Sequence, residues 1–201
     1  MRIGVIGAGS IGRTLGALLR TAGHEVMLSW SSTPDRLAQA AAEVGAGART
    51  GTPEQAVAFA DMVLFAPRFE HVTAARDAAG SLADVIVIDT TNPYNPQRDG
   101  VVDLDGLTAG QHVAALLPGA RYVKGFNTLT SGFLAEATGR VGAHQAVVLL
   151  CGEDAPAKRV VGGLVRELGF APVDLGGLAE SARQEPGGDL YGEELHVADL
   201  P

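Results

Sequence analysis

The stretch Arg2-Ile3-Gly4-Val5-Ile6-Gly7-Ala8-Gly9-Ser10-Ile11-Gly12 decides the fold class. Its first five residues form an apolar run of strand length, and the glycines that follow have the spacing G-x-G-x-x-G. From Ser10 to Thr21 the apolar residues recur at helical spacing, so the glycines join a strand to a helix. This context, more than the glycines themselves, is typical of a dinucleotide-binding turn.

Each glycine of such a turn has its own purpose. Gly7 allows the tight turn, Gly9 leaves room for a pyrophosphate, and Gly12 lets the helix pack closely on the strand. The free N–H groups at the helix start then face the phosphates. We therefore expect the whole loop to contact a dinucleotide: Gly7, Ala8, Gly9, Ser10, Ile11 and Gly12. The alternative is a structural glycine turn that binds nothing.

Further along the chain, short apolar runs alternate with helical patterns. Strands are expected at residues 25–30, 62–66, 85–88, 122–126, 146–150 and 170–173, and helices at about 33–44, from 52, and at 69–79, 108–117 and 156–168. Such alternation predicts a Rossmann-type α/β fold, a doubly wound, mostly parallel sheet with helices on both faces. We expect one domain over residues 1–201 with a small C-terminal extension, in which residues 120–201 complete both the sheet and an acceptor pocket.

Composition limits the classes of partner. The formal net charge of −8 disfavours nucleic acid and anionic membranes. The single cysteine, Cys151, excludes an internal disulfide and is expected to be a small apolar strand residue. Without a signal peptide or a run of roughly 20 apolar residues, the protein is expected to be cytoplasmic. The expected partner is a small-molecule redox substrate, no metal site is foreseen, and a homodimer is left open.

The turn after the second expected strand indicates which dinucleotide is bound. NAD-binding domains usually carry a carboxylate there, which accepts hydrogen bonds from the ribose. This chain has Ser31, Ser32 and Thr33 instead, and no carboxylate before Asp35. Hydroxyl groups, helix N–H groups and Arg36 would suit a 2′-phosphate, so NADP is predicted. The alternative is that Ser32 and Thr33 only cap a helix.

The remaining strand ends supply the rest of the expected site, because ligands bind beyond the carboxyl ends of the strands in such sheets. Ala66 with Pro67, and Asn92 with Pro93, are expected to contact the nicotinamide. Asn127 and Thr128 are expected near a second substrate. No residue has a clear proton-transfer role, so catalysis is expected to rest on positioning by Asn92, Asn127 and Thr128.

Three titratable residues lie beside these loops. Asp89 ends a strand and is interpreted as a cap, His71 could flank the site, and Lys124 is expected to be a surface lysine.

The sequence resembles the NADPH-dependent coenzyme F420 reductases and the short NADP oxidoreductases that share their domain. The resemblance covers nearly the whole chain. It is carried by the opening glycine stretch and by these later motifs: Ala22-Gly23-His24-Glu25-Val26, Ala66-Pro67 with Glu70-His71, Ile88-Asp89 with Asn92-Pro93, Val123-Lys124 with Phe126-Asn127-Thr128, Gly152-Glu153-Asp154, Asp174-Leu175-Gly176 and Glu185-Pro186.

This resemblance implies a Rossmann domain that exchanges a hydride between NADP(H) and coenzyme F420, with a small insertion that helps to hold the deazaflavin. Three positions differ from the family pattern. Ser32 replaces an arginine that is usual in the serine turn, for which Arg36 could substitute, Arg68 replaces a tryptophan, and Gly125 replaces an alanine.

Two alternatives remain from the sequence. One is a short NADPH oxidoreductase that uses another acceptor, such as a flavin or a quinone. The other is a non-catalytic dinucleotide-sensing domain. The chain ends before the helical domain that hydroxyacid and imine dehydrogenases carry, so the acceptor is expected to lie on the Rossmann domain itself, where the two rings need only be aligned.

Overall fold

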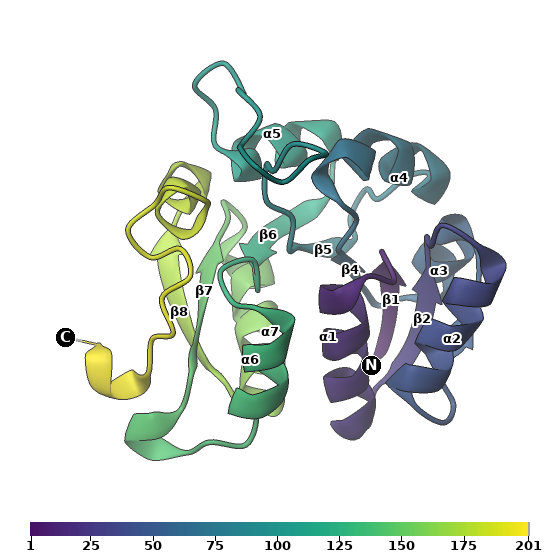
Figure 1. Cartoon of the computed structure of the whole chain (residues 1–201), viewed down its shortest axis with the longest axis horizontal. Coiled ribbons are helices and arrows are strands. Elements are labelled where there is room, and N and C mark those ends of the chain that lie inside the picture. Colours follow the sequence, from purple (N-terminus) through teal and green to yellow (C-terminus); the bar gives the residue numbers. More distant parts are fainter. Residues whose placement is uncertain (201) are drawn as a thin grey trace.

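One eight-stranded sheet organises the computed structural model, which describes residues 1–200 (Figure 1). Its strands are β1 (Arg2–Ile6), β2 (Glu25–Ser29), β3 (Arg49–Thr50), β4 (Met62–Phe65), β5 (Ile86–Asp89), β6 (Arg121–Gly125), β7 (Val147–Cys151) and β8 (Ala171–Gly176). The α-helices are α1 (Ser10–Thr21), α2 (Pro34–Val44), α3 (Pro53–Phe59), α4 (Val72–Ala79), α5 (Ala109–Leu116), α6 (Ser131–Ala137) and α7 (Ala155–Glu167).

The strand order β3-β2-β1-β4-β5-β6-β7-β8 confirms the predicted Rossmann-type fold. All neighbouring strands are parallel except β6 and β7, which pair antiparallel over Lys124–Cys151 and Gly125–Leu150. From β1 the chain builds β2 and β3 on one side, then crosses back to place β4 on the other side of β1. A crevice therefore opens between the carboxyl ends of β1 and β4, where ligands bind in such sheets.

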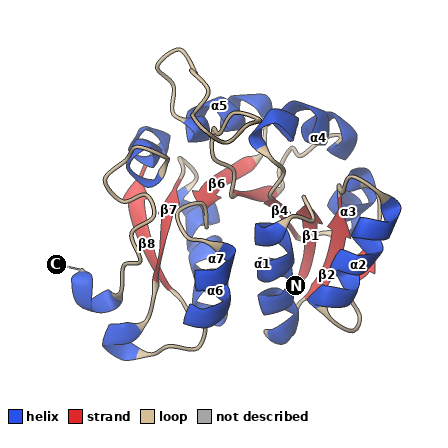
Figure 2. Ribbon diagram, viewed as in Figure 1, coloured by secondary structure: helices blue, strands red, loops and turns tan. Residues whose placement is uncertain are grey.

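Helices cover both faces of the sheet (Figure 2). Met62 and Leu64 of β4 belong to the core shared with α1, α2, α6 and α7, whereas Val63 and Phe65 belong to the core shared with α4 and α5. Because successive side chains of a strand point to opposite faces, a strand covered on both sides must be apolar throughout. That is the reason why β4 is a continuous apolar run.

Threonine caps fix several helix starts. Thr33 accepts a hydrogen bond from the backbone N–H of Arg36, and Thr52 does the same for Gln55, each followed by a proline in the first turn. The prediction of these two helix starts is confirmed.

Some elements were not predicted. The helix α6 follows β6, and the tail beyond Gly176 forms two 3₁₀ helices, η3 (Leu178–Gln184) and η4 (Val197–Asp199). The two-residue strand β3 was also missed. Each has too few residues to show a hydrophobic period.

Gly12→Ala should destabilise the fold without entering any ligand site. A Cβ at Gly12 would collide with the carbonyl oxygen of Gly7, so the β1–α1 turn would have to shift. We expect a loss of roughly 1–3 kcal/mol in the free energy of unfolding, measured by urea denaturation. Gly163→Ala in α7 is the matched control, since a Cβ there meets nothing within 4 Å and should stabilise the helix by up to about 1 kcal/mol. Equal effects of the two variants would contradict the packing argument.

Candidate active site

The turn between β1 and α1 is built as a dinucleotide-binding turn requires. Gly7 has φ +115°, and its N–H donates to the carbonyl oxygen of Ser29 at 3.0 Å. Gly9 precedes the first turn of α1 and offers no side-chain cap, so the N–H groups of that turn have no side-chain partner there. An added Cβ at Gly9 would meet nothing within 4 Å, whereas one at Gly7 would strike the backbone of Ala66. The space beside Gly9 is thus open to a ligand.

A cavity of about 550 Å³ lies over this turn and is here called the dinucleotide cavity. Nine of the residues predicted to bind the cofactor line it: Gly7, Ala8, Gly9, Ser10, Ser31, Ser32, Arg36, Ala66 and Pro67. Arg13, Trp30, Gln39, Arg68 and His71 complete its lining.

The serine turn after β2 forms one end of this cavity. Arg36 donates to the hydroxyl of Ser32 at 3.3 Å, so its guanidinium reaches back over the turn. Thr33 is occupied with capping α2 and does not line the cavity. No aspartate or glutamate is among the described lining residues, whereas three arginines are. An anion is therefore better accommodated here than a pair of ribose hydroxyls that need a carboxylate.

A second cavity, of about 400 Å³, adjoins the first and is here called the acceptor cavity. The two share Gly9, Ser10 and the segment Ala66–Arg68, so they form one trough across the strand ends. The acceptor cavity contains Ile11, Asn92, Asn127 and Thr128, which were predicted, and Tyr94, Arg98 and Tyr191, which were not. Gly12 and Pro93 line neither cavity, since Gly12 packs against the turn and Pro93 is buried.

Two asparagines at neighbouring strand ends bind each other. Asn92 donates from Nδ2 to the carbonyl oxygen of Asn127 at 2.7 Å, and Asn127 donates from Nδ2 to Oδ1 of Asn92 at 3.0 Å. The Nδ2 group of Asn127 also donates to the carbonyl oxygen of Gln184 at 2.6 Å. The pair therefore fixes the floor of the acceptor cavity and ties it to the C-terminal segment.

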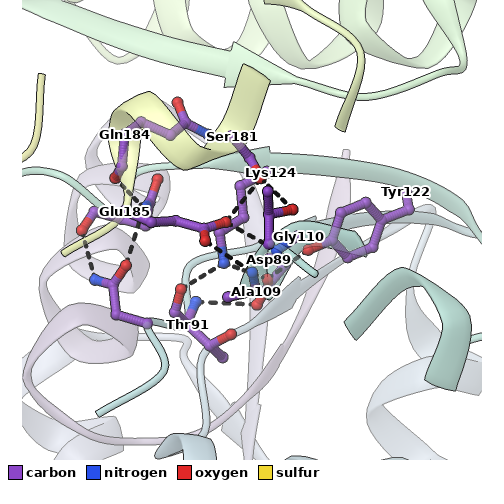
Figure 3. Close-up of polar contacts among 12 residues, drawn as sticks. Asp89, Thr91, Ala109, Gly110, Tyr122, Lys124, Ser181, Gln184 and Glu185 are labelled. Carbon is purple, nitrogen blue, oxygen red and sulfur yellow. Dashed lines mark hydrogen bonds and ion pairs between the residues drawn. The ribbon is translucent and has the colours of Figure 1, made fainter. Parts of the chain in front are cut away.

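A buried ion pair lies beneath this floor, and it corrects the expectation that Lys124 is a surface lysine (Figure 3). The side chains of Lys124 and Asp89 are both 0% exposed, with Nζ and Oδ2 2.7 Å apart. Tyr122 donates from its hydroxyl to the same oxygen of Asp89 at 2.6 Å, and the backbone N–H of Thr91 donates to Oδ1 at 2.9 Å. Lys124 also donates to the carbonyl oxygen of Thr91 at 2.5 Å.

This network determines the conformation of residues 89–91 and leaves Asp89 out of contact with the trough. Burial, and next the Asp89 charge, raise the pKa of the Tyr122 hydroxyl well above its usual value, so it remains a neutral donor.

The C-terminal segment is anchored on α5 by a second buried carboxylate (Figure 3). Glu185 accepts hydrogen bonds from the backbone N–H groups of Ala109 at 2.7 Å and Gly110 at 2.8 Å, in the first turn of α5. Ser181 donates its hydroxyl to Glu185 at 2.7 Å. A carboxylate at a helix start complements both the free N–H groups and the helix dipole. The anchor holds the segment where Tyr191 lines the acceptor cavity.

Other predicted features lie outside the trough. Cys151 is buried in β7, where burial raises the pKa of its thiol to about 12, which leaves it an inert apolar residue as predicted. Over residues 1–200, no group of three or more His, Cys, Asp or Glu side chains could hold a metal ion. None of the described helices combines the length and the apolar character needed to cross a membrane.

Comparison with known proteins agrees with this geometry. The family described as NADP oxidoreductase, coenzyme F420-dependent, matches residues 2–93. A hypothetical protein from Sinorhizobium meliloti has a structure with TM-score 0.87 at 31% identity, and the match covers 98% of this chain and 95% of that one. A protein from an Arthrobacter species, provisionally assigned as an F420-dependent NADP reductase, has TM-score 0.75 at 28% identity, with 88% and 85% covered.

Among curated proteins, the chain is 31% identical over 183 residues to the metalloreductase STEAP3 of Rattus norvegicus. That match covers 91% of this chain but 35% of the rat protein, so the chain spans about a third of its length.

Lys124→Met should destabilise the protein strongly, because it leaves the carboxylate of Asp89 buried without its cation. Removal of one partner from a buried pair costs roughly 3–5 kcal/mol. The matched control is Lys158→Met, which breaks the 2.6 Å contact with Asp174, a carboxylate that is 55% exposed and can be hydrated. We expect urea denaturation to show a markedly larger loss for Lys124→Met than for Lys158→Met. Equal losses would mean that the Asp89–Lys124 pair is not important to the fold.

Proposed function

We propose that the chain, whose residues 2–93 match the family described as NADP oxidoreductase, coenzyme F420-dependent, transfers a hydride between NADP(H) and a flat ring acceptor. NADP(H) would lie in the dinucleotide cavity with its nicotinamide toward Ala66, and the acceptor would lie in the acceptor cavity.

The open space beside Gly9 carries this proposal. The backbone conformation at Gly9 has a negative φ of −78°, so the protein itself does not require a glycine there. Steric crowding does not require a glycine either, because a Cβ added at Gly9 would meet no atom of the protein within 4 Å. A ligand that approaches the backbone explains the glycine, and the uncapped N–H groups at the start of α1 suit a pyrophosphate.

Preference for NADP over NAD follows from the serine turn. Arg36 and the hydroxyl groups of Ser31 and Ser32 line the end of the cavity where the adenosine ribose would lie. They would donate hydrogen bonds to a 2′-phosphate, and no carboxylate among the described lining residues would repel it.

The chain's own residues supply positioning. The nicotinamide provides the hydride when it is bound. The Asn92–Asn127 pair and Thr128 shape the floor of the acceptor cavity, and the Asp89–Lys124 pair fixes the backbone beneath it. In such a site, catalysis comes mainly from alignment of two rings about 3–3.5 Å apart.

Coenzyme F420 is the acceptor that we propose first, because residues 2–93 match a family described as coenzyme F420-dependent. A flavin or quinone is the second candidate, because either ring could also be aligned with a nicotinamide. The relative STEAP3 is named a metalloreductase, which is a reason to test acceptors other than F420.

Isotope transfer distinguishes these acceptors. We expect the protein to oxidise NADPH in the presence of F420 and to transfer deuterium from the C4 position of the nicotinamide to the acceptor. A deazaflavin receives hydride at a carbon atom and should keep the label, whereas a flavin receives it at a nitrogen and should lose it to water. F420, flavin mononucleotide and a naphthoquinone should be compared by absorbance and mass spectrometry.

Gly9→Val is the control without cofactor binding, since its side chain would occupy the pyrophosphate space. Oxidation of NADPH no faster than with Gly9→Val for every acceptor would refute the proposal.

Ser31→Asp should weaken NADPH binding and shift the preference toward NADH. The new carboxylate would repel a 2′-phosphate and could accept from a free ribose hydroxyl. We expect the ratio of the two dissociation constants to change by ten-fold or more, which corresponds to about 1.4 kcal/mol, in calorimetric titrations. Ser31→Asn has a similar size without the charge and should change the ratio far less. A wild-type protein that binds both cofactors equally would contradict the assignment of NADP.

A further inference from the structure

We propose that the paired phenols of Tyr94 and Tyr191 donate a hydrogen bond to the acceptor and select rings in which a carbonyl oxygen is conjugated with the hydride-accepting atom. This inference rests on the proposed function, because it concerns the acceptor end of the same trough.

The two tyrosines reach the acceptor cavity from distant parts of the chain. Tyr94 follows β5, whereas Tyr191 belongs to the C-terminal segment that Glu185 anchors on α5. Their hydroxyl oxygens are 3.0 Å apart, and their rings meet edge to face with centroids 6.5 Å apart. The two hydroxyls therefore form one polar unit in the wall of the cavity.

Counting protons leaves one donor free. Each phenol carries one O–H proton, and the single hydrogen bond between the two uses one of them. The other contact of Tyr191 is with Nδ2 of Asn92 at 3.5 Å, where the amide donates and takes no proton. Within residues 1–200 no other group forms a hydrogen bond with either hydroxyl. Whichever phenol donates to the other, one phenolic proton remains for a ligand in the cavity.

The surroundings favour a neutral donor beside developing negative charge. Burial, and next the hydrogen bond with Tyr94, raise the pKa of the Tyr191 hydroxyl above its usual value, so it stays protonated at neutral pH. The guanidinium of Arg98 lies 5.3 Å from the centre of the Tyr94 ring. No described carboxylate lies within ion-pair distance of Arg98, whereas Arg68, which also lines the cavity, is paired with Glu70 at 2.9 Å.

The chemistry gives such a donor a purpose. A hydride brings two electrons and one proton to the acceptor, so the acceptor gains one negative charge until a second proton arrives from water. When a carbonyl oxygen is conjugated with the accepting atom, that charge spreads to the oxygen. A hydrogen bond to a charged oxygen is stronger than one to a neutral carbonyl. The phenol would therefore stabilise the transition state more than the bound oxidised acceptor, and it would keep its own proton.

Because one phenolic proton is left over, the loss of a single tyrosine hydroxyl should still leave one hydrogen-bond donor for the acceptor. Tyr94→Phe leaves Tyr191 with an unused O–H, and Tyr191→Phe does the same for Tyr94, so each single variant keeps one donor. Only the double variant has none. We expect each single variant to lose no more than about threefold in kcat/KM, and the double variant to lose roughly ten- to hundredfold, more than the product of the single losses. The loss should fall mainly on kcat.

A second measurement tests the hydrogen bond without turnover. The carbonyl stretching frequency of a bound, oxidised naphthoquinone or F420 should be lower in the wild type than in the double variant, as seen by Raman difference spectroscopy in the presence of NADP⁺. The dissociation constant for NADPH should be unchanged, because neither tyrosine lines the dinucleotide cavity.

The outcomes separate this inference from the proposed function. A wild type that reduces no acceptor overturns both. A wild type that is active, with a double variant within threefold of it or with losses that simply multiply, overturns the phenol donor alone. A cooperative loss in kcat together with the frequency shift supports the donor.

Discussion

The buried ion pair between Asp89 and Lys124 is the constraint on which the acceptor side of the site depends. Two charges removed fully from water are tolerated only when their remaining hydrogen-bonding positions are satisfied. Here Tyr122 and the backbone of Thr91 supply the further hydrogen bonds to the two charged groups. Because these partners come from β5, β6 and the loop after β5, the charges hold the two strand ends in one arrangement. Asn92 and Asn127 follow these two strand ends, so the same arrangement places them within hydrogen-bonding distance of each other.

The C-terminal segment completes the cavity that the strands begin. Glu185 fastens the segment to the first turn of α5, and the carbonyl oxygen of Gln184 accepts from Asn127 on the cavity floor. Tyr191 follows six residues after Glu185 and lines the cavity, with its hydroxyl 3.0 Å from that of Tyr94. The acceptor cavity is therefore an assembly of the Rossmann strand ends with an added wall, and the positions of both parts are set by buried carboxylates.

The fold and the cofactor side could be predicted from the sequence because their signals are local. The glycine turn, the serine turn and the apolar run of β4 each lie within about a dozen residues. The order of residue types within each stretch is enough to predict a turn or a strand. The acceptor side could be predicted only in part: Asn92, Asn127 and Thr128 follow strand ends and line the cavity, but its other residues are brought there by contacts between distant parts of the chain. Lys124 looks like any strand-end lysine until Asp89, 35 residues earlier, is seen beside it. Tyr94 and Tyr191 are 97 residues apart, and the tail that carries Tyr191 has no period that would indicate its position.

Charge is the property in which the site and the whole chain differ most. With a net charge of −8, the protein repels anions at a distance, yet the proposed cofactor is an anion. The conflict is resolved locally, since the described lining of the dinucleotide cavity has three arginines, one helix start and no carboxylate. Solvent screens charges beyond about 8–10 Å at physiological salt, so the acidic surface elsewhere contributes little inside the trough. Arg13 is already paired with Glu43 at 2.6 Å, which leaves Arg36 beside the serine turn as the cation best placed to distinguish a 2′-phosphate from a hydroxyl.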